Sequence, residues 1–453
     1  MSQFLAKVPR GWLILACIGL IALNMRGPFV AVAPVVESLR HDLGFSPVEL
    51  GLLTGIPVLC FSLASPLASM AGRRFGAEFA IMLTLLGVLA GVVIRSSGGG
   101  VPVMVGTVLI GVAITIGNIA VPLIIRRDFA PRRQATAMGV YTAALNIGSF
   151  LTSVVTAPLA DLVGWRLSLA ASALLALAAI VFWIPTVGVR RALVPSPVPP
   201  VASSAAGPGR GVGWLVAGLT LGFAGQAFSY YGVTAWLPSF LSDELAMGAA
   251  EAGAGSSLFQ IFAILGGLGV PLLARFSSTT TVAATLGALW LTVPVGLLLV
   301  PGWWWLWSSL GGIAQGGGIT VIFIAIIKFA HSQAAAGKMS AVVQGVGYCF
   351  AALAPTIIGY VHDATGGWTV PLFVILGSVL TFCICTTASV RWVSRHPLNP
   401  TGDSKRPTER SVGRLLSPRR GRFPVLGRFP RPSGSLVAKS AGGPASGLWR
   451  GRR

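Results

Sequence analysis

Apolar runs of about 20 residues recur along the whole chain, and no other feature limits its fold as strongly. A helix needs about this length to cross the hydrocarbon core of a bilayer. The runs are continuous instead of alternating with a period of two, which indicates helices rather than the strands of a barrel. Only 10% of the 453 residues are charged, against about 25% in an average soluble protein. We therefore expect an all-α polytopic membrane protein.

The apolar runs divide into twelve predicted spans, and the charge pattern supports this count. Lys and Arg gather in the cytoplasmic loops of membrane proteins. With the N-terminus inside, the segments predicted to lie outside hold only three basic residues, Arg40, Arg95 and Arg166, and most of the acidic ones. Both termini are then predicted to be cytoplasmic. The spans are 12–36, 50–72, 77–95, 101–125, 134–159, 165–186, 213–240, 252–274, 280–300, 302–327, 338–361 and 367–391.

Short segments of the first part of the chain recur later at a nearly constant distance. Glu49 and Glu251 are 202 residues apart, and all the matched pairs are 201 to 204 residues apart. Matches at one distance, each at the same place in the order of spans, indicate two six-helix pseudo-repeats with the same orientation. Transporters built from such repeats bind their substrate between the halves, near the middle of the bilayer. The other pairs are Pro34 and Pro238, Met138 and Met339, Asp161 and Asp363, and Trp165 and Trp368.

The repeat and the composition together divide the chain into four parts. A stretch rich in Pro, Ser, Ala and Gly separates the halves, and a tail rich in Arg, Pro, Gly and Ser follows the last span. The tail contributes strongly to the net charge of +21 and should be disordered. It is either a solvated extension or a segment that contacts anionic lipid headgroups, and we do not expect it to bind nucleic acid. The parts are the N-terminal half (1–186), a cytoplasmic linker (187–212), the C-terminal half (213–391) and the tail (392–453).

Arg26 stands near the middle of the first predicted span, where a permanent charge is costly. An arginine at the centre of a membrane helix costs about 2.5–3.5 kcal/mol on insertion scales. It is the only formal charge that we place well inside a span, and no carboxylate within a span is available to pair with it. Gly27 and Pro28 follow and weaken the helix, so a local opening is expected. Arg26 therefore either binds a small anion through its planar fork of donors or ties helices together through carbonyl groups.

Five segments run through both halves: LIALNMRGPFVAVAPVVESLR, LTGIPVLCF, GNIAVPLIIRRDF, YGVTAWLPSFL and AGKMSAVVQGVGYCFAALAP. Together they resemble the cyanate/nitroimidazole transporter family of the major facilitators, over residues 12–391. The resemblance implies the major facilitator fold and a permease of the bacterial cytoplasmic (inner) membrane for a small anion or small polar solute. It also implies that Arg26 faces the central cavity.

Other polar and aromatic residues inside the spans are candidates for substrate binding beside Arg26. Each has a structural alternative, because buried amides hydrogen-bond between helices and aromatic rings pack well anywhere in a membrane bundle. We expect a substrate-binding set made of Arg26, Asn24, Tyr230, Gln344, Trp236, Gln226, Asn118 and Asn146.

Two basic clusters at predicted cytoplasmic loops are candidates for gating. The loop after the second span reads SPLASMAGRRFG and resembles the facilitator motif G-x-x-x-D-x-x-G-R-R, with Ser65 and Ser69 in place of the glycine and the aspartate. A cluster after the fourth span supplies part of a replacement latch, or else anchors the loop as the positive-inside rule requires. The gating candidates are Arg73, Arg74, Arg126, Arg127 and Asp128.

These patterns favour a permease with Arg26 as the anion anchor. The chain has no HExxH motif, no paired carboxylates, no catalytic Ser/His arrangement and no cluster with metal spacing, so we expect no enzyme activity, metal or cofactor. A drug or nitroimidazole-type efflux transporter is the main alternative, and a non-transporting sensor or a membrane enzyme is weaker. No Asp, Glu or His lies deep in a span, so uniport, anion exchange and symport with the substrate's own acid all stay open. We expect a monomer whose partners are a small substrate and the lipid bilayer.

Overall fold

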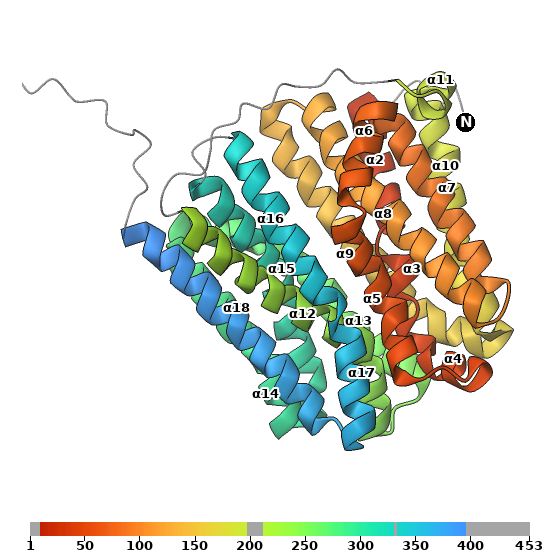
Figure 1. Ribbon diagram of the computed structural model, residues 1–453, viewed down its shortest axis with the longest axis vertical. Helices are drawn as coiled ribbons and strands as arrows, with labels where there is room; N and C mark the ends of the chain where they lie inside the picture. The colour runs from red at the N-terminus through yellow and green to blue at the C-terminus, as the bar shows by residue number, and fades with distance from the viewer. Residues whose placement is uncertain (1–9, 197–211, 330–332, 396–453) are drawn as a thin grey trace, which may run out of the picture. The chain divides into compact units, whose positions relative to one another are not determined.

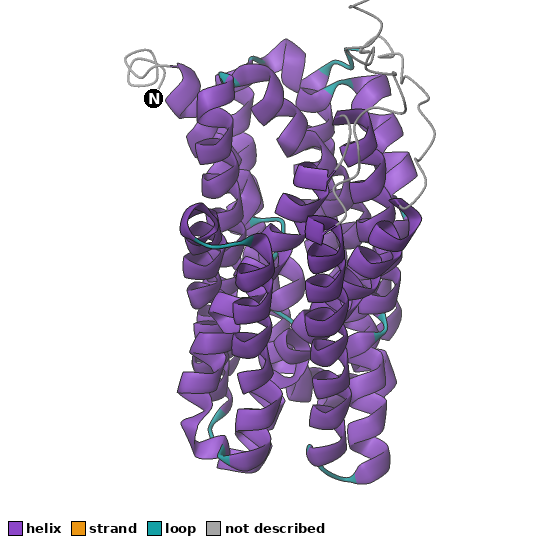
Figure 2. Ribbon diagram, turned by 90° about the vertical axis from the view of Figure 1, so that its left-hand side faces the viewer, coloured by secondary structure: helices purple, strands orange, loops and turns teal. Residues whose placement is uncertain are grey.

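The computed structural model describes residues 10–196, 212–329 and 333–395, and these residues form helices joined by short turns, without a strand among them (Figure 2). The all-α prediction is confirmed. Most of the predicted linker and nearly all of the predicted tail lie outside the described residues. The helices are α2 (Arg10–Leu23), α3 (Gly27–Val30), η1 (Ala33–Val35), α4 (Val36–Leu43), α5 (Pro47–Leu63), α6 (Ser65–Phe75), α7 (Ala77–Ser96), α8 (Gly100–Asp128), α9 (Pro131–Ala170), α10 (Ser172–Val187), α11 (Val189–Leu193), α12 (Val212–Leu245), α13 (Ala249–Phe276), α14 (Thr279–Leu299), η2 (Pro301–Trp303), α15 (Trp304–Phe329), α16 (Gln333–Ala352), α17 (Ala354–Thr365) and α18 (Thr369–Arg395).

The twelve predicted spans are consistent with these helices, although several spans are bent or joined. Within the described residues, nine helical segments are long and apolar enough to cross a membrane, or ten if the bent pair of α5 and α6 counts as one span. That pair bends by 57°. The fifth span and the start of the sixth run together in α9, with a break at Gly164, whose φ of 82° favours glycine.

The first span is broken in its middle, as the Gly27-Pro28 pair predicts. α2 ends at Leu23, a turn follows, and α3 is a single turn with Arg26 at its N-cap. Proline has no N–H and cannot continue the hydrogen-bond ladder of a preceding helix. The break therefore leaves residues 24–26 as a turn instead of a regular helix, with Asn24 and Met25 buried.

Helix packing is most extensive between helices of the same predicted half, for example α7 with α8 and α12 with α18 (Figure 1). Across the halves, α9 packs against α13, and α5 packs against α16 and α17. The α5 contact is so close that glycine is required there. A Cβ at Gly51 would lie 2.5 Å from Thr356 Cα, and one at Gly55 would overlap the carbonyl oxygen of Ala352.

The same tryptophan–aspartate contact occurs once in each half. Trp165 Nε1 donates to Asp42 Oδ2 at 2.8 Å, and Trp368 Nε1 donates to Asp243 Oδ2 at 3.0 Å. The aspartates are 201 residues apart and the tryptophans 203 apart, so both separations fall in the range of the internal repeat. In each half, this contact ties the end of the first span to the start of the last.

Trp165→Phe tests how much the contact between Trp165 and Asp42 contributes to the stability of the folded protein. We expect the thermal midpoint in detergent to fall by a few degrees, since the change removes a hydrogen bond to a carboxylate that Arg166 still contacts at 2.9 Å. The loss corresponds to about 1–2 kcal/mol. Trp303→Phe is the matched control, because Trp303 is exposed and no described residue bonds its indole N–H. An equal shift in both variants would show that the contact with Asp42 is not the cause.

Candidate substrate-binding site

Arg26 connects the two predicted halves through one of its guanidinium nitrogens. Nη1 donates to Asn146 Oδ1 at 3.1 Å and to Tyr230 Oη at 3.3 Å. Asn146 belongs to α9 and Tyr230 to α12, so the break in the first span aims Arg26 at the boundary between the halves. The guanidinium carbon also lies 5.2 Å from the centroid of the Tyr230 ring, within the range of a cation–π contact.

The acceptors of Arg26 are oriented by further hydrogen bonds. Asn146 Nδ2 donates to Thr142 O at 3.0 Å, one turn earlier in α9, which directs its Oδ1 toward Arg26. Tyr230 Oη donates to Gln260 Oε1 at 3.4 Å, and Gln260 Nε2 donates to Thr234 Oγ1 at 3.3 Å. A chain of polar contacts thus runs from α9 through Arg26 into α12 and α13, and it fixes the guanidinium at one place.

No carboxylate among residues 10–196, 212–329 and 333–395 neutralises the charge of Arg26. No described carboxylate lies within ion-pair distance of it, and no described residue accepts a hydrogen bond from its Nε or Nη2. The side chain stays partly accessible, in contrast to the fully buried residues around it. Arg26 therefore presents a positive charge with unused donors, which is the chemistry that binds a carboxylate or a similar small anion.

Tyrosine side chains lie near the guanidinium, with the Tyr230 ring in contact with it. Four of the five tyrosines in the chain lie within electrostatic reach of Arg26, namely Tyr141, Tyr230, Tyr231 and Tyr348. The rings of Tyr230 and Tyr231 are 4.8 Å apart, and those of Tyr231 and Tyr348 are 6.5 Å apart. Apolar ring surface beside the guanidinium lowers the local polarity, which strengthens its interaction with an anion.

Tyr230→Phe tests the polar part of this arrangement. The change removes the hydroxyl that bonds Arg26 and Gln260 but keeps the ring beside the guanidinium. We expect substrate affinity to fall about tenfold, as the loss of one hydrogen bond to a charged group predicts. Tyr231→Phe is the matched control, since no described residue bonds the Tyr231 hydroxyl. Saturation curves of transport give the apparent substrate affinity of each variant. An equal loss of affinity in Tyr230→Phe and Tyr231→Phe would contradict a special role for the Tyr230 hydroxyl.

Two other asparagines among the candidates bond to neighbouring helices instead of Arg26. Asn24 is buried in the same break, where its Nδ2 donates to Leu20 O at 2.9 Å and to Leu175 O at 3.2 Å. Asn118 accepts from the Tyr141 hydroxyl at 3.0 Å. Asn24 thus ties α2 to α10, and Asn118 ties α8 to α9 through Tyr141, one of the tyrosines near Arg26.

Three further candidates also lie outside the contacts of Arg26. Gln226 is buried and donates to the backbone oxygen of Gln315 at 3.2 Å, while Gln344 bonds Ser340 Oγ in its own helix at 2.7 Å. Trp236 donates to Pro355 O at 2.7 Å. The described contacts of these three side chains are with other helices or within their own helix, so a role in binding remains a prediction for each.

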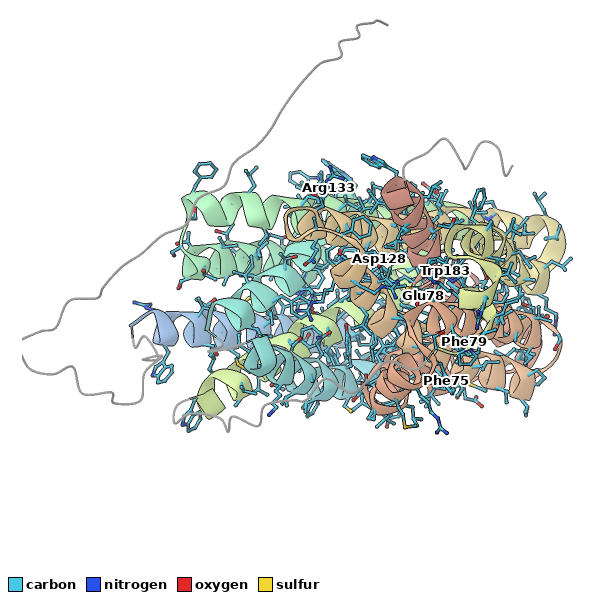
Figure 3. The ribbon with its side chains drawn as sticks, turned by 90° about the horizontal axis from the view of Figure 1, so that it is seen from above. Phe75, Glu78, Phe79, Asp128, Arg133 and Trp183 are labelled. Carbon is cyan, nitrogen blue, oxygen red and sulfur yellow. The ribbon has the colours of Figure 1, made fainter. Side chains whose placement is uncertain are left out.

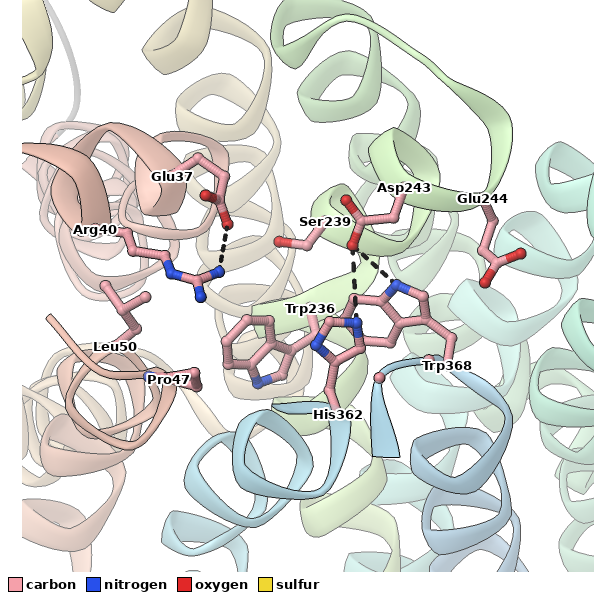
Figure 4. A pocket seen from close by; sticks show the side chains of 12 residues that line it. Glu37, Arg40, Pro47, Leu50, Trp236, Ser239, Asp243, Glu244, His362 and Trp368 are labelled. Atoms are coloured by element: carbon pink, nitrogen blue, oxygen red, sulfur yellow. Dashed lines mark hydrogen bonds and ion pairs between the residues drawn. The ribbon is translucent and has the colours of Figure 1, made fainter. Parts of the chain in front are cut away.

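Trp236 lines a separate pocket on the side predicted to lie outside. This pocket has a volume of about 470 Å³, and Arg26 is not among its lining residues. Figure 4 shows it between α4 and α5 of the first half and the ends of α12 and α17 in the second. Its polar lining residues are Glu37, Arg40, Ser239, Asp243, Glu244 and His362.

Two of the predicted gating residues, Arg127 and Asp128, take part in an ion-pair cluster within the first half. Arg127 pairs with Glu78 Oε1 at 2.8 Å and with its neighbour Asp128 at 2.6 Å. Glu78 lies in the first turn of α7, so this pairing joins two helices of the first half, close to Trp183 (Figure 3). Arg74 and Arg126 are exposed, and the side chain of Arg73 lies outside the described residues.

Several residues of the site were not singled out by the sequence. Gln260 is an isolated amide in the apolar run LFQIFAIL, and this isolation is the one signal that marks it. Tyr231 lies one position after the candidate Tyr230, and Tyr348 lies four positions after the candidate Gln344. Helical spacing alone does not tell which of two adjacent tyrosines faces a cavity, because both faces of a membrane helix are apolar.

Comparisons with known proteins show the family to which the chain is similar. The family model described as the Major Facilitator Superfamily matches residues 14–336. A 2-nitroimidazole transporter of Escherichia coli (strain K12) is 34% identical over 370 residues, which cover 79% of this chain and 90% of the relative. A cyanate transport protein of the same organism is 26% identical, over 77% of this chain and 90% of the relative. The crystal structure of a D-xylose–proton symporter superposes with a TM-score of 0.66 at 13% identity, over 85% of this chain and 97% of the symporter, which is a likeness of fold.

Proposed function

Because the chain belongs to the major facilitator superfamily and is a membrane transporter, we propose that it moves a small anion or small polar solute by alternating access. The observation that carries the proposal is the partly accessible guanidinium of Arg26, which has unused donors and no carboxylate partner among the described residues. In this proposal the solute binds Arg26 between the halves 1–186 and 213–391, with Asn146 and Tyr230 holding the guanidinium in place. The membrane is the bacterial cytoplasmic membrane, and both termini are cytoplasmic.

Alternating access follows from a site whose parts belong to both halves. Arg26 and Asn146 come from the first half, and Tyr230 and Gln260 from the second. When the halves rock, the contact between Arg26 and Tyr230 breaks or forms, so a bound solute is exposed to one side and then to the other. The repeated tryptophan–aspartate contact supports two halves that move as units.

Coupling to protons does not need an acidic side chain at this site. The electrostatic neighbours of Arg26 are tyrosines, and no described carboxylate or histidine pairs with it. Intramembrane proton carriers are usually Asp, Glu or His. Anion exchange, uniport and symport in which the solute carries its own proton are therefore the modes that fit the site.

Export of a nitroimidazole-like compound is the second candidate function. Two observations favour it: the higher identity to the relative named a 2-nitroimidazole transporter, and the tyrosine rings that stand beside Arg26 and suit a flat heteroaromatic solute. Such a solute would still use the guanidinium, which hydrogen-bonds to a nitro group or to an anionic ring.

Uptake into proteoliposomes separates the two functions. Purified protein is reconstituted, and entry of radiolabelled cyanate, acetate and 2-nitroimidazole is compared with entry into protein-free liposomes. Saturable entry of cyanate or acetate supports the small-anion permease, while saturable entry of 2-nitroimidazole alone supports the second candidate. If the reconstituted protein carries none of the three, in either direction and with each compound also loaded inside for exchange, both proposals fail.

A further inference from the structure

Arg95 is a second arginine inside the helix bundle, and its burial is not expected from the sequence. As the last residue of the third predicted span it was expected in an outside segment, yet the structure buries it, with 1% of its surface exposed. The reason is the packing of α7 on α8. Gly91 and Gly106 let these helices approach so closely that Gly106 faces the backbone of Arg95, and the arginine side chain turns inward.

The Arg95 guanidinium is bound to the broken first span. Its Nη1 donates to the carbonyl oxygen of Pro28 at 2.6 Å. In a regular helix this oxygen would accept from the N–H of Val32, but Val32 donates to Phe29 O at 3.4 Å instead. No backbone N–H of the described residues bonds to Pro28 O. Arg95 therefore supplies a donor to a carbonyl that is left free where α3 ends at Val30.

This contact lies two residues from the site. α3 is a single turn in which Val30 N donates to Arg26 O at 3.2 Å and Ala31 N donates to Gly27 O at 2.9 Å. The hydrogen bond from Arg95 to Pro28 O thus fixes the single turn of α3, and Arg26 is the N-cap of that turn. With α3 held, the Arg26 side chain reaches Asn146 and Tyr230, whereas a turn that moved freely would not keep these two distances.

The burial of Arg95 also indicates a role beyond filling space. Its Nε and Nη2 are buried, and no residue in the described part of the chain accepts a hydrogen bond from them. A buried cation with unsatisfied donors destabilises a membrane protein, and an apolar residue of similar volume would fill the same place at lower cost. Such an arrangement persists where the one contact that the cation makes is needed.

We propose that Arg95 is a positioning residue: by holding the Pro28 carbonyl, it keeps the break in the first span in the form that presents Arg26 to the solute. The link to solute binding rests on the proposed function, but the link to the backbone does not. The two links are therefore tested by separate measurements.

The first measurement is hydrogen–deuterium exchange of the full-length protein, followed by mass spectrometry of peptides that cover residues 24–35. Arg95→Met should raise the exchange rate of these amides about tenfold or more, as the loss of a hydrogen bond to a charged group predicts. Arg95→Lys keeps one donor and should restore most of the protection. Arg166→Met is the matched control, because Arg166 lies at the exposed end of the bundle and contacts Asp42 instead of the break. Unchanged exchange in Arg95→Met would overturn the proposal.

The second measurement is a double-mutant cycle on transport of the solute that the wild type carries. Arg95→Met should raise KM about tenfold with little change in the maximal rate per folded protein, and it should add nothing in an Arg26→Gln background. A loss of folded protein without a change in KM, or equal effects in both backgrounds, would show that Arg95 does not act through Arg26. Should Arg26→Gln itself transport normally, the proposed function fails, while the exchange result still decides whether Arg95 holds the break.

Discussion

Replacing Arg26 by glutamine should lower the transport efficiency for a small anion about 100-fold or more. Truncating one member of a buried, hydrogen-bonded charge pair costs about 2–5 kcal/mol, and here the bound solute would lose its only cationic partner. Folding should not suffer, because glutamine is cheaper than arginine at the centre of a membrane helix and still hydrogen-bonds Asn146 or Tyr230. Uptake into proteoliposomes, scaled to the amount of folded protein, gives the ratio of the transport efficiencies of wild type and Arg26→Gln.

Two companion variants make the Arg26 result specific. Arg26→Lys keeps the charge but loses the planar fork, so we expect partial activity, between those of the wild type and Arg26→Gln. Arg40→Gln removes an arginine at the rim of the outer pocket, where it lies 3.9 Å from Glu37, and should leave transport within about twofold. If Arg40→Gln were as damaging as Arg26→Gln, a general loss of positive charge would explain both.

Gly55→Ala should impair transport about 5- to 150-fold, because the two halves could no longer close against each other as they do here. The new Cβ would overlap the carbonyl oxygen of Ala352, and backbone cannot move aside as a flexible side chain can. Forcing an extra carbon into a packed contact costs about 1–3 kcal/mol, which shifts the equilibrium between closed and open forms by that factor. The initial rate of solute uptake measures the effect.

Gly345→Ala is the matched control for Gly55→Ala. It lies on the facing helix α16, and a Cβ there would meet no atom within 4 Å. Alanine also favours a helix over glycine by about 1 kcal/mol, so this variant should be at least as stable as the wild type and should transport normally. Equal impairment of both variants would mean that glycine itself, and not the close approach to Ala352, is what transport needs.

The sequence predicts the core of the site because a charge inside a membrane has few explanations. Arg26 is visible as the one formal charge well inside a predicted span, and Asn146 and Tyr230 as polar or aromatic residues in other spans. The structure brings these three together. The fold is equally readable, since the length of apolar runs and the loop charges follow from the bilayer itself.

What the sequence does not reveal depends on helix rotation and on close packing. Gln226 and Gln344 carry the same kind of side chain as Gln260, yet it is Gln260 that bonds Tyr230. Arg95 was counted with the outside segments, and nothing in a linear pattern shows that Gly91 and Gly106 draw α7 onto α8 and turn that side chain inward. Both points concern the direction of a side chain, and a helix that is apolar on all faces has no amphipathic stripe to indicate it.

The most direct test is the equilibrium affinity of purified wild type and Arg26→Gln for the anion that the wild type carries, measured by isothermal titration calorimetry in detergent. Binding needs no conformational cycle, so the result does not depend on gating or coupling. We predict measurable binding to the wild type and a loss of about 100-fold or more in Arg26→Gln, with equal thermal midpoints for the two proteins. Equal affinities would contradict Arg26 as the anchor and assign it a structural role.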